Sequence, residues 1–409
     1  MHTWTPADVL RLLPLGLVGL LSWGVWAYRR FSSHRARPVV NDFTTTTSLV
    51  VPSFREDPQV LSQCLDTWLA EGPDEVILVV DVADVGCLEM LAARRLPAHV
   101  RVMPFRHRGK RSALGVGIRA ATRDVVLLAD SDTAWTQGLL RHVVMPFVDP
   151  TVGGVGTRQR VAARETSVWR RVASWMVDTR YLDYVPAMGA RGGVACLSGR
   201  TAAYRRSLVL PVLEQLEHEI FLGRECVAGD DGRLTWLILA GGHRTVHQDS
   251  AQAVSMFPDT LRAFVKQRIR WSRNSYRCYV TAAWNGWLWH QPFITQVTVL
   301  QILLTPVTMA TSIVFVVLAF VGKPLPLAAL YVGWVVVGRG IRGFSHLREQ
   351  PRDLVLLPLV VVMTVVIALP IKLVAMVTMN RQGWLTRHAD HVGGEGQDAA
   401  SLANHAIAS

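Results

Sequence analysis

Short apolar runs that end on a polar residue or a proline limit the fold of this chain more than any other feature. Residues 76–81 read Val-Ile-Leu-Val-Val-Asp, and residues 124–130 read Asp-Val-Val-Leu-Leu-Ala-Asp. Both runs are apolar, rich in β-branched residues and short for helices, so they predict buried strands. A third strand of this kind is expected at residues 48–52.

Helical patterns separate these strands, at residues 59–70 and 111–121. Because strands alternate with helices, we expect an α/β domain with a mainly parallel sheet over residues 41–255. Ligands bind such sheets at the carboxyl ends of the strands, which here are Pro52, Asp81 and Asp130.

Hydrophobic residues make up 50% of the 409 residues, and the longest apolar runs lie outside the predicted sheet. Residues 8–28 are long enough to cross a bilayer. A signal peptide is the alternative, but no basic segment precedes this run and no small-residue cleavage site follows it. We therefore expect an N-terminal transmembrane helix within residues 1–30. The arginines that follow predict a cytoplasmic α/β domain.

The C-terminal third predicts a transmembrane region over residues 291–380. Its apolar runs lie at about 294–322, 325–338 and 354–378. The basic residues 339–352 between the last two runs indicate a cytoplasmic loop. Pro370 leaves open whether the last run crosses the membrane or turns back at its surface. The polar tail, residues 389–409, is predicted to be disordered. The chain is thus expected to be a multi-pass plasma membrane protein.

The chain is strongly basic, with a formal net charge of +12. Such a charge suits nucleic acid, an anionic membrane surface or a phosphorylated substrate. The apolar segments favour the last two, and no nucleic-acid-binding module is evident, so no nucleic acid partner is expected. The five cysteines include no Cys-x-x-Cys pair, which argues against a disulfide framework or a zinc site and fits a reducing compartment.

Two acidic motifs point to chemistry. Asp130 and Asp132 follow a strand, and such carboxylates can hold Mg²⁺ or Mn²⁺ beside a diphosphate. By itself this motif is more typical of solvated turn residues. Asp230 and Asp231 precede a helix expected at residues 232–239. They are either helix-capping charges, or one is structural and the other a general base.

Basic and aromatic residues supply complementary groups. Lys110 and Arg111 begin a helix and could meet phosphate, although charge runs usually face solvent. Residues 256–290 predict interfacial helices, beginning with a basic amphipathic one. Within it, Arg270 offers a fork for phosphate oxygens, and Trp271 offers a face for a sugar ring. In isolation, such a tryptophan is more often part of the core.

Together these motifs resemble the processive, membrane-embedded family 2 glycosyltransferases. That family includes hyaluronan, chitin and cellulose synthases, and the hyaluronan synthase form is the most similar. The resemblance covers about residues 45–388. It rests on Val51-Pro52-Ser53-Phe54-Arg55-Glu56-Asp57, Gly109-Lys110-Arg111, Asp130-Ser131-Asp132, Ser198-Gly199, Gly229-Asp230-Asp231 and the Gln267, Arg270, Trp271 set. The chain departs from it in having one evident N-terminal span rather than two, and Arg200 where many relatives have proline.

The resemblance implies a GT-A fold, a UDP-sugar donor, inversion at the anomeric carbon and export of a polymer through the protein's own helices. It implies Asp231 as the catalytic base, beside Asp230, and Asp132 as the ligand of Mg²⁺ or Mn²⁺. The implied nucleotide-sugar-binding residues are Pro52, Glu56, Asp81, Lys110, Arg111, Asp130, Gln267 and Arg270. The implied acceptor-binding residues are Ser198, Gly199 and Trp271.

The sequence therefore predicts a polysaccharide synthase that acts on a UDP-sugar and a growing polysaccharide or glycolipid acceptor. It is expected to work in a lipid bilayer without an obligate protein partner. One alternative is transfer of a single sugar to a lipid-linked acceptor, although that class generally lacks the Gln-x-x-Arg-Trp motif. A transporter or scaffold with an inactive domain is another, but it would not need Asp132 and Asp231 together. The sequence does not name the sugar.

Overall fold

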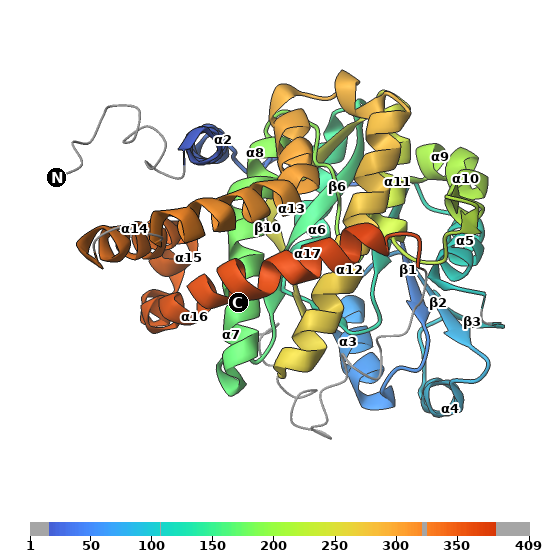
Figure 1. Ribbon diagram of the computed structural model, residues 1–409. Helices are drawn as coiled ribbons and strands as arrows, with labels where there is room; N and C mark the ends of the chain where they lie inside the picture. The colour runs from blue at the N-terminus through green and yellow to red at the C-terminus, as the bar shows by residue number, and fades with distance from the viewer. Residues whose placement is uncertain (1–15, 107, 321–324, 382–409) are drawn as a thin grey trace.

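An eight-stranded sheet forms the centre of the computed structural model, which describes residues 16–106, 108–320 and 325–381 (Figure 1). The strands are β1 (Thr47–Ser53), β2 (Glu75–Asp81), β3 (Val100–Phe105), β4 (Val125–Ala129), β5 (Thr133–Trp135), β6 (Val152–Val161), β7 (Thr201–Arg205) and β10 (Arg244–Ser255). Their order across the sheet is β3-β2-β1-β4-β7-β6-β10-β5. A separate two-stranded hairpin joins β8 (Ile220–Phe221) to β9 (Arg224–Glu225).

The sheet is mainly parallel, as predicted. Strand β1 pairs in parallel with β2 and β4, and parallel pairs also join β2 to β3 and β6 to β10. Strand β7 runs antiparallel between β4 and β6, and β5 runs antiparallel beside β10. The predicted strands at 48–52, 76–81 and 124–130 are confirmed as β1, β2 and β4, next to one another in the sheet.

Both faces of the sheet are covered, which explains why these strands are continuous apolar runs. Val50 and Val126 face one core, whereas Leu49, Val51 and Leu127 face the other. The first core includes side chains of α5 (Lys110–Ala120), α11 (Asp230–Ala240) and α12 (Leu261–Trp284). The second includes side chains of α3 (Pro58–Glu71), α4 (Val85–Ala93) and α6 (Leu139–Val144).

Long apolar helices extend from the sheet domain. They are α2 (Gly16–His34), α13 (Phe293–Phe320) and α14 (Leu325–Arg342). In the described part of the chain, two segments are long and apolar enough to cross a membrane, Phe293–Thr311 and Pro351–Val377. The first half of the predicted N-terminal span and the predicted disordered tail lie outside the described residues.

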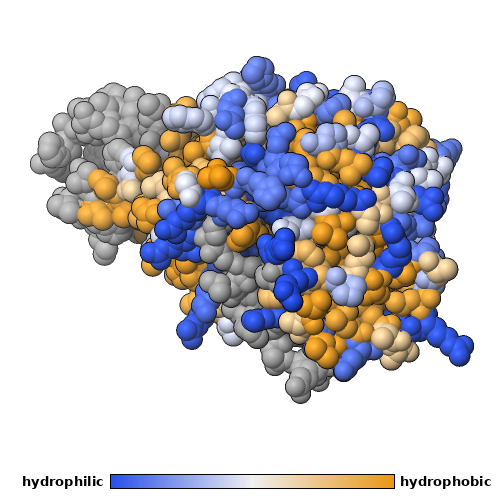
Figure 2. Space-filling model, turned by 90° about the vertical axis from the view of Figure 1, so that its right-hand side faces the viewer, coloured by the Kyte–Doolittle hydropathy of each residue, from blue (hydrophilic) through white to orange (hydrophobic). Residues whose placement is uncertain are grey.

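Several large apolar side chains of these helices are exposed. Val307 and Val314 on α13 and Val332 on α14 are 58%, 56% and 50% exposed. The face shown in Figure 2, which is the right-hand side of the molecule in Figure 1, carries both hydrophobic and hydrophilic side chains, with hydrophilic ones across its middle. Large exposed apolar side chains of this kind suit a lipid environment.

The last apolar run is a broken helix that packs on the sheet domain. It consists of η6 (Pro351–Leu356), α16 (Leu357–Val362), a π-helical turn (Met363–Ile367) and α17 (Ala368–Val377). The π-helical turn directly precedes the turn that contains Pro370, a residue with no backbone N–H to donate. The helix therefore continues past Pro370.

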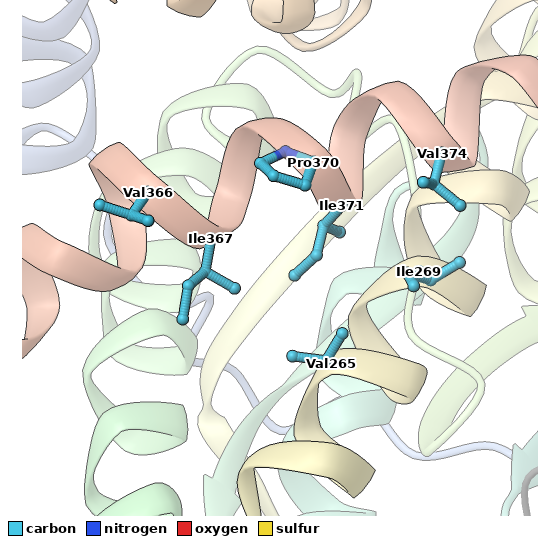
Figure 3. A pocket seen from close by; sticks show the side chains of 7 residues that line it. All are labelled: Val265, Ile269, Val366, Ile367, Pro370, Ile371 and Val374. Carbon is cyan, nitrogen blue, oxygen red and sulfur yellow. The ribbon is translucent and has the colours of Figure 1, made fainter.

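Helix α17 crosses α12 (Figure 1), and two hydrogen bonds join the middle of α12 to the middle and the C-terminal end of α17. Lys372 Nζ donates to Ser272 Oγ at 3.2 Å, and Arg273 Nε donates to Thr378 Oγ1 at 2.8 Å. An apolar groove lies between the two helices (Figure 3). Its lining residues are Val265, Ile269, Val366, Ile367, Pro370, Ile371 and Val374.

The basic segment predicted as a cytoplasmic loop is partly buried against the sheet domain. Arg348 and Arg352 are exposed, but His346 in α15 (Phe344–Glu349) is fully buried. Both nitrogens of His346 meet carboxylates, those of Asp178 and Asp353. This segment therefore anchors the C-terminal helices to the sheet domain.

Candidate active site

Lys110 joins the two acidic motifs. Its Nζ lies 2.7 Å from Asp130 Oδ1 and 3.0 Å from Asp230 Oδ2. Asp130 directly follows β4, Asp230 is the first residue of α11 and Lys110 is the first residue of α5. The fold therefore brings the strand end and two helix N-termini to one place.

Lys110 offsets the negative charge of Asp130 and Asp230. Burial alone would lower the pKa of Lys110, but Asp130 and Asp230 raise it well above its usual value. Burial raises the pKa of Asp230, an effect that Lys110 opposes and Asp231 reinforces. Lys110 is thus held as a cation among carboxylates, where it can also meet an anionic ligand.

Gly199 makes this close approach possible. A Cβ atom at this position would lie 3.1 Å from Lys110 Nζ, 3.4 Å from Asp230 Oδ2 and 3.5 Å from Asp231 Cβ. The first distance is tighter than side chains normally allow, so a larger residue would displace the lysine. The predicted acceptor-side glycine therefore lies directly against the two acidic motifs.

The adjacent aspartates differ in their surroundings. Gly229 has a left-handed backbone (φ 78°) that begins α11 and turns Asp230 toward Lys110. Asp231 is half-buried, and its Oδ1 accepts the Gly232 N–H at 2.8 Å. Asp230 is therefore committed to an ion pair, whereas Asp231 is the better placed of the two to accept a proton.

The thiol of Cys196 is a neighbour of Asp231 that the sequence did not single out. Its Sγ lies 3.6 Å from Asp231 Oδ2 and is the donor of this hydrogen bond. Burial and the Asp231 carboxylate raise the pKa of Cys196 to about 12, so the thiol keeps its proton. The only sequence signal was that Cys196 lies two residues before Ser198.

Of the predicted nucleotide-binding residues that follow β1 and end β2, Glu56 contacts the Asp130–Asp132 turn. Glu56 is buried, and its Oε2 accepts a 2.5 Å hydrogen bond from Ser131 Oγ. Asp81 is also buried at the end of β2, and its Oδ1 accepts the Ala83 N–H at 2.8 Å. Glu56 therefore fixes the position of the turn that carries both aspartates.

Asp132 is the remaining carboxylate of that turn. It is half-buried and accepts a long hydrogen bond of 3.4 Å from Thr133 Oγ1. Over residues 16–106, 108–320 and 325–381, no three His, Cys, Asp or Glu side chains are grouped closely enough to hold a metal ion. Mg²⁺ and related ions are commonly bound by one or two carboxylates together with substrate phosphates. Asp132 thus fits such an ion in the presence of a diphosphate.

Arg111, which the resemblance implies to be a nucleotide-sugar-binding residue, has its guanidinium engaged within the protein. Its guanidinium is buried and donates to the carbonyl groups of Leu216, Ala228 and Gly229. It also forms an ion pair of 2.7 Å with Glu219. In this structure Arg111 holds the loop in front of Asp230, while its neighbour Lys110 faces the acidic residues.

The motif on α12 lies against the first core. Gln267 is buried, and Arg270 and Trp271 are half-buried. The Trp271 ring meets the Phe257 ring edge-on, with centroids 6.0 Å apart. The guanidinium carbon of Arg200 lies 5.1 Å from the Trp271 ring centroid. Trp271 therefore packs partly against the core, as the structural alternative predicted, and adjoins the loop that follows Gly199.

Comparison with known proteins gives consistent matches. Residues 45–274 match the family model described as glycosyltransferase like family 2. An N-acetylglucosaminyltransferase of Azorhizobium caulinodans is 29% identical over 361 residues, which cover 85% of this chain and 88% of that protein. A type 2 glycosyltransferase of Pyricularia oryzae is 26% identical over 403 residues, covering 91% of this chain and 80% of that protein.

A solved structure has a similar fold. It is a mannosyltransferase from Pyrobaculum calidifontis in complex with GDP-Man and Mn²⁺. The two structures superpose with a TM-score of 0.58 over 85% of this chain and 98% of the mannosyltransferase, at 20% sequence identity. At this identity the similarity shows the fold only.

Proposed function

This chain belongs to glycosyltransferase family 2 and has the GT-A fold, and from that premise we propose that it adds N-acetylglucosamine from a UDP-linked donor to a growing β-linked saccharide. The predicted enzyme class and fold are thereby confirmed. The choice of sugar rests on relatives that are named N-acetylglucosaminyltransferases. It replaces the emphasis on hyaluronan synthase that the motifs alone gave.

The contact of Lys110 with both Asp130 and Asp230 is the observation on which the proposal depends. A transferase must hold the diphosphate of its donor within bonding distance of the acceptor hydroxyl. The Asp130–Asp132 turn is the donor side of this site, and Asp231 is the base side. Lys110 lies between them and can offset the negative charge that develops on the leaving diphosphate.

In the proposed reaction, Asp231 takes the proton of the acceptor hydroxyl while that oxygen attacks C1 of the donor sugar. A bond forms between the acceptor oxygen and C1, and the bond from C1 to the diphosphate oxygen breaks. UDP leaves with the electron pair, and attack from the opposite face gives inversion. A bound Mg²⁺ or Mn²⁺, held by Asp132 and the diphosphate, would stabilise the charge on the leaving group.

The other residues are proposed to bind the two substrates. Pro52, Glu56, Asp81, Gln267 and Arg270 are assigned to the donor side. Ser198, Gly199 and Trp271 are assigned to the acceptor side. Arg111 is proposed to stabilise the loop before Asp230 rather than to bind substrate, because its guanidinium donates to the carbonyl groups of Ala228 and Gly229.

The enzyme is proposed to work at a membrane, with residues 41–255 in the cytoplasm, 256–290 at the surface and 291–380 within the bilayer. The apolar segments Phe293–Thr311 and Pro351–Val377 support this arrangement. So do Trp284 and Trp289, which are 88% and 52% exposed near the end of α12, where an interfacial aromatic belt is expected. Passage of the product between the helices is part of the same proposal.

Release of UDP by the purified chain in lipid nanodiscs tests this function. We expect release with UDP-N-acetylglucosamine in the presence of Mn²⁺, and its loss in excess EDTA. Asp132→Asn should have the same effect as EDTA. Asp124→Asn, at the opposite end of β4, is the matched control and should remain active.

Two outcomes would contradict the proposal. Full activity in EDTA would remove the metal from the reaction, and the absence of UDP release with every UDP-sugar would reject the donor class. Product size separates a polymerase from the alternative, because transfer of one sugar to a lipid-linked acceptor gives a product of a single length.

A further inference from the structure

Three arginines from separate elements surround the proposed acceptor side. Arg180 begins the π-helical turn after α7 (Val168–Thr179), Arg200 precedes β7, and Arg268 lies on α12. Arg180 Nη2 donates to the carbonyl of Cys196 at 3.1 Å, two residues before Ser198. The guanidinium carbons of Arg200 and Arg268 lie 5.1 Å and 4.9 Å from the Trp271 ring centroid.

Arg268 stands out because part of its hydrogen-bonding capacity is unused. Its Nε and Nη2 atoms are buried and have no hydrogen-bond partner among the residues that the structure describes. Burial lowers the pKa of Arg268, and the neighbouring charges of Arg200 and Arg180 lower it further. Buried N–H groups of a cation that meet no acceptor are costly to the folded state, so native proteins rarely keep them without a use.

Aromatic packing accounts for only part of this arrangement. Arg268 lies over the rings of Phe264 and Trp271, at 5.0 Å and 4.9 Å from their centroids. Such cation–π contacts engage the face of the guanidinium. They leave its in-plane N–H groups free, and these are the groups that form a fork around a carboxylate or a phosphate.

Two carboxylates of the proposed donor side, Asp130 and Asp132, affect the pKa of Arg200. Burial lowers the pKa of Arg200, whereas the carboxylates of Asp132 and Asp130 oppose this effect. Arg268 lies 4.9 Å from the Trp271 ring centroid and is therefore beside the ring that is assigned to the acceptor side.

We infer that Arg268, assisted by Arg200 and Arg180, binds an oxyanion that the acceptor carries. The group is either the carboxylate of a uronic acid sugar or the phosphate of a lipid-linked saccharide, since both present paired oxygens to a guanidinium fork. The inference rests on the proposed function, because that function identifies this side of the site as the place of the acceptor.

Anion binding to the whole chain in nanodiscs tests the inference without turnover. Saturating UDP and Mn²⁺ occupy the donor side, and inorganic phosphate or glucuronate is titrated by calorimetry at constant ionic strength. Arg268→Gln should weaken binding of the preferred anion by about tenfold or more, the usual effect of losing a hydrogen bond to a charged group. Preference for glucuronate indicates a uronic acid acceptor, and preference for phosphate indicates a lipid-linked one.

Arg262→Gln is the matched control, because Arg262 is exposed at the start of the same helix. It should bind both anions like the unaltered protein. Arg268→Lys, which keeps the charge but loses the fork, should bind with intermediate affinity.

Thermal stability separates an anion site from a structural arginine. Arg268→Gln removes buried N–H groups that meet no acceptor in the described part of the chain, so its melting temperature should be unchanged or higher. If Arg268 were needed for the fold, the melting temperature would fall. Equal anion affinity in Arg268→Gln and the unaltered protein would overturn the inference, as would a large fall in melting temperature. If anion binding behaves as expected but no UDP-sugar is used, the proposed function fails and the anion site remains.

Discussion

Two buried polar networks of this protein differ in how completely their groups are partnered. The first, the His346 network, joins His346, Asp178, Asp353, Arg164 and Arg171. His346 lies 2.7 Å from Asp178 Oδ2 and 2.9 Å from Asp353 Oδ2. Arg164 and Arg171 also donate to Asp353, each at 2.5 Å. Both arginines of this network meet the Asp353 carboxylate, and each ring nitrogen of His346 meets a carboxylate.

The second network, at the active site, is incomplete. Lys110 meets Asp130 and Asp230, but within the described residues the hydrogen bond that Asp132 accepts is a long one, 3.4 Å from Thr133 Oγ1. Arg268 has buried N–H groups that meet no acceptor in the described part of the chain. The comparison teaches that a network whose charged groups meet one another holds elements together. A network in which some groups lack such partners keeps hydrogen-bonding capacity for ligands.

Among the substitutions considered, loss of the proposed base should cause the largest change, a fall in the rate of transfer. Asp231→Asn is expected to reduce transfer by about 10²–10⁴-fold, the usual contribution of a general base. Its affinity for UDP should be unchanged, because Lys110 keeps both of its carboxylates. The measurements are kcat with saturating donor and calorimetric binding of UDP.

Asp230→Asn is the matched comparison at the adjacent position. It breaks the ion pair with Lys110, so it should weaken UDP binding as well as transfer. If Asp230→Asn were inactive with normal UDP affinity while Asp231→Asn stayed active, the two roles would be reversed.

The His346 network should respond in stability rather than in catalysis. Asp353→Asn leaves three basic side chains facing a neutral amide, and breaking a buried ion pair in this way costs about 3–5 kcal/mol. The free energy of unfolding should fall by that amount, whereas transfer per folded molecule should stay normal. Denaturant unfolding and activity of the folded fraction measure the two quantities.

Glu165 provides the control, because it meets the same two arginines from the surface. It lies 3.2 Å from Arg164 and 3.8 Å from Arg171, with its side chain 71% exposed. Glu165→Gln should cost less than about 1 kcal/mol, as exposed ion pairs usually do. Equal losses of unfolding free energy in Glu165→Gln and Asp353→Asn would show that the buried ion pairs of this network stabilise the fold no more than exposed ones.

Trp271 should give the smallest effect, because it belongs partly to the core and partly to the acceptor side. Aromatic contacts contribute about 0.5–1.5 kcal/mol beyond burial, so Trp271→Ala should weaken acceptor use by about tenfold. UDP binding should be near normal, and the products should become shorter. The test is the length distribution of products, beside calorimetric binding of UDP.

Trp287→Ala is a control at another half-buried tryptophan, outside the proposed site. A stable Trp271→Ala protein that makes products of normal length would remove Trp271 from the acceptor side. Loss of stability and UDP affinity together would assign it to the core instead.

The sequence alone determined the central strands and the acidic motifs. Strands β1, β2 and β4 are apolar on both faces, which is a local property, so their residues revealed them directly. Strand β6 (Val-Gly-Gly-Val-Gly-Thr-Arg-Gln-Arg-Val) has no such run and was missed. The position of Asp130 after a strand and of Asp230 at a helix start also followed from local pattern.

Tertiary structure decided which of these residues meet. Lys110 and Arg111 are adjacent in sequence, but successive residues on a helix point about 100° apart, so one faces Asp130 and the other the Gly229 loop. The contact of Lys110 with Asp230 depends on how α5 and α11 are arranged around the sheet. Whether Arg268 has a partner likewise depends on packing of distant elements. Local sequence fixes burial and periodicity, whereas pairing between distant charges is fixed only when the sheet order and helix packing are set.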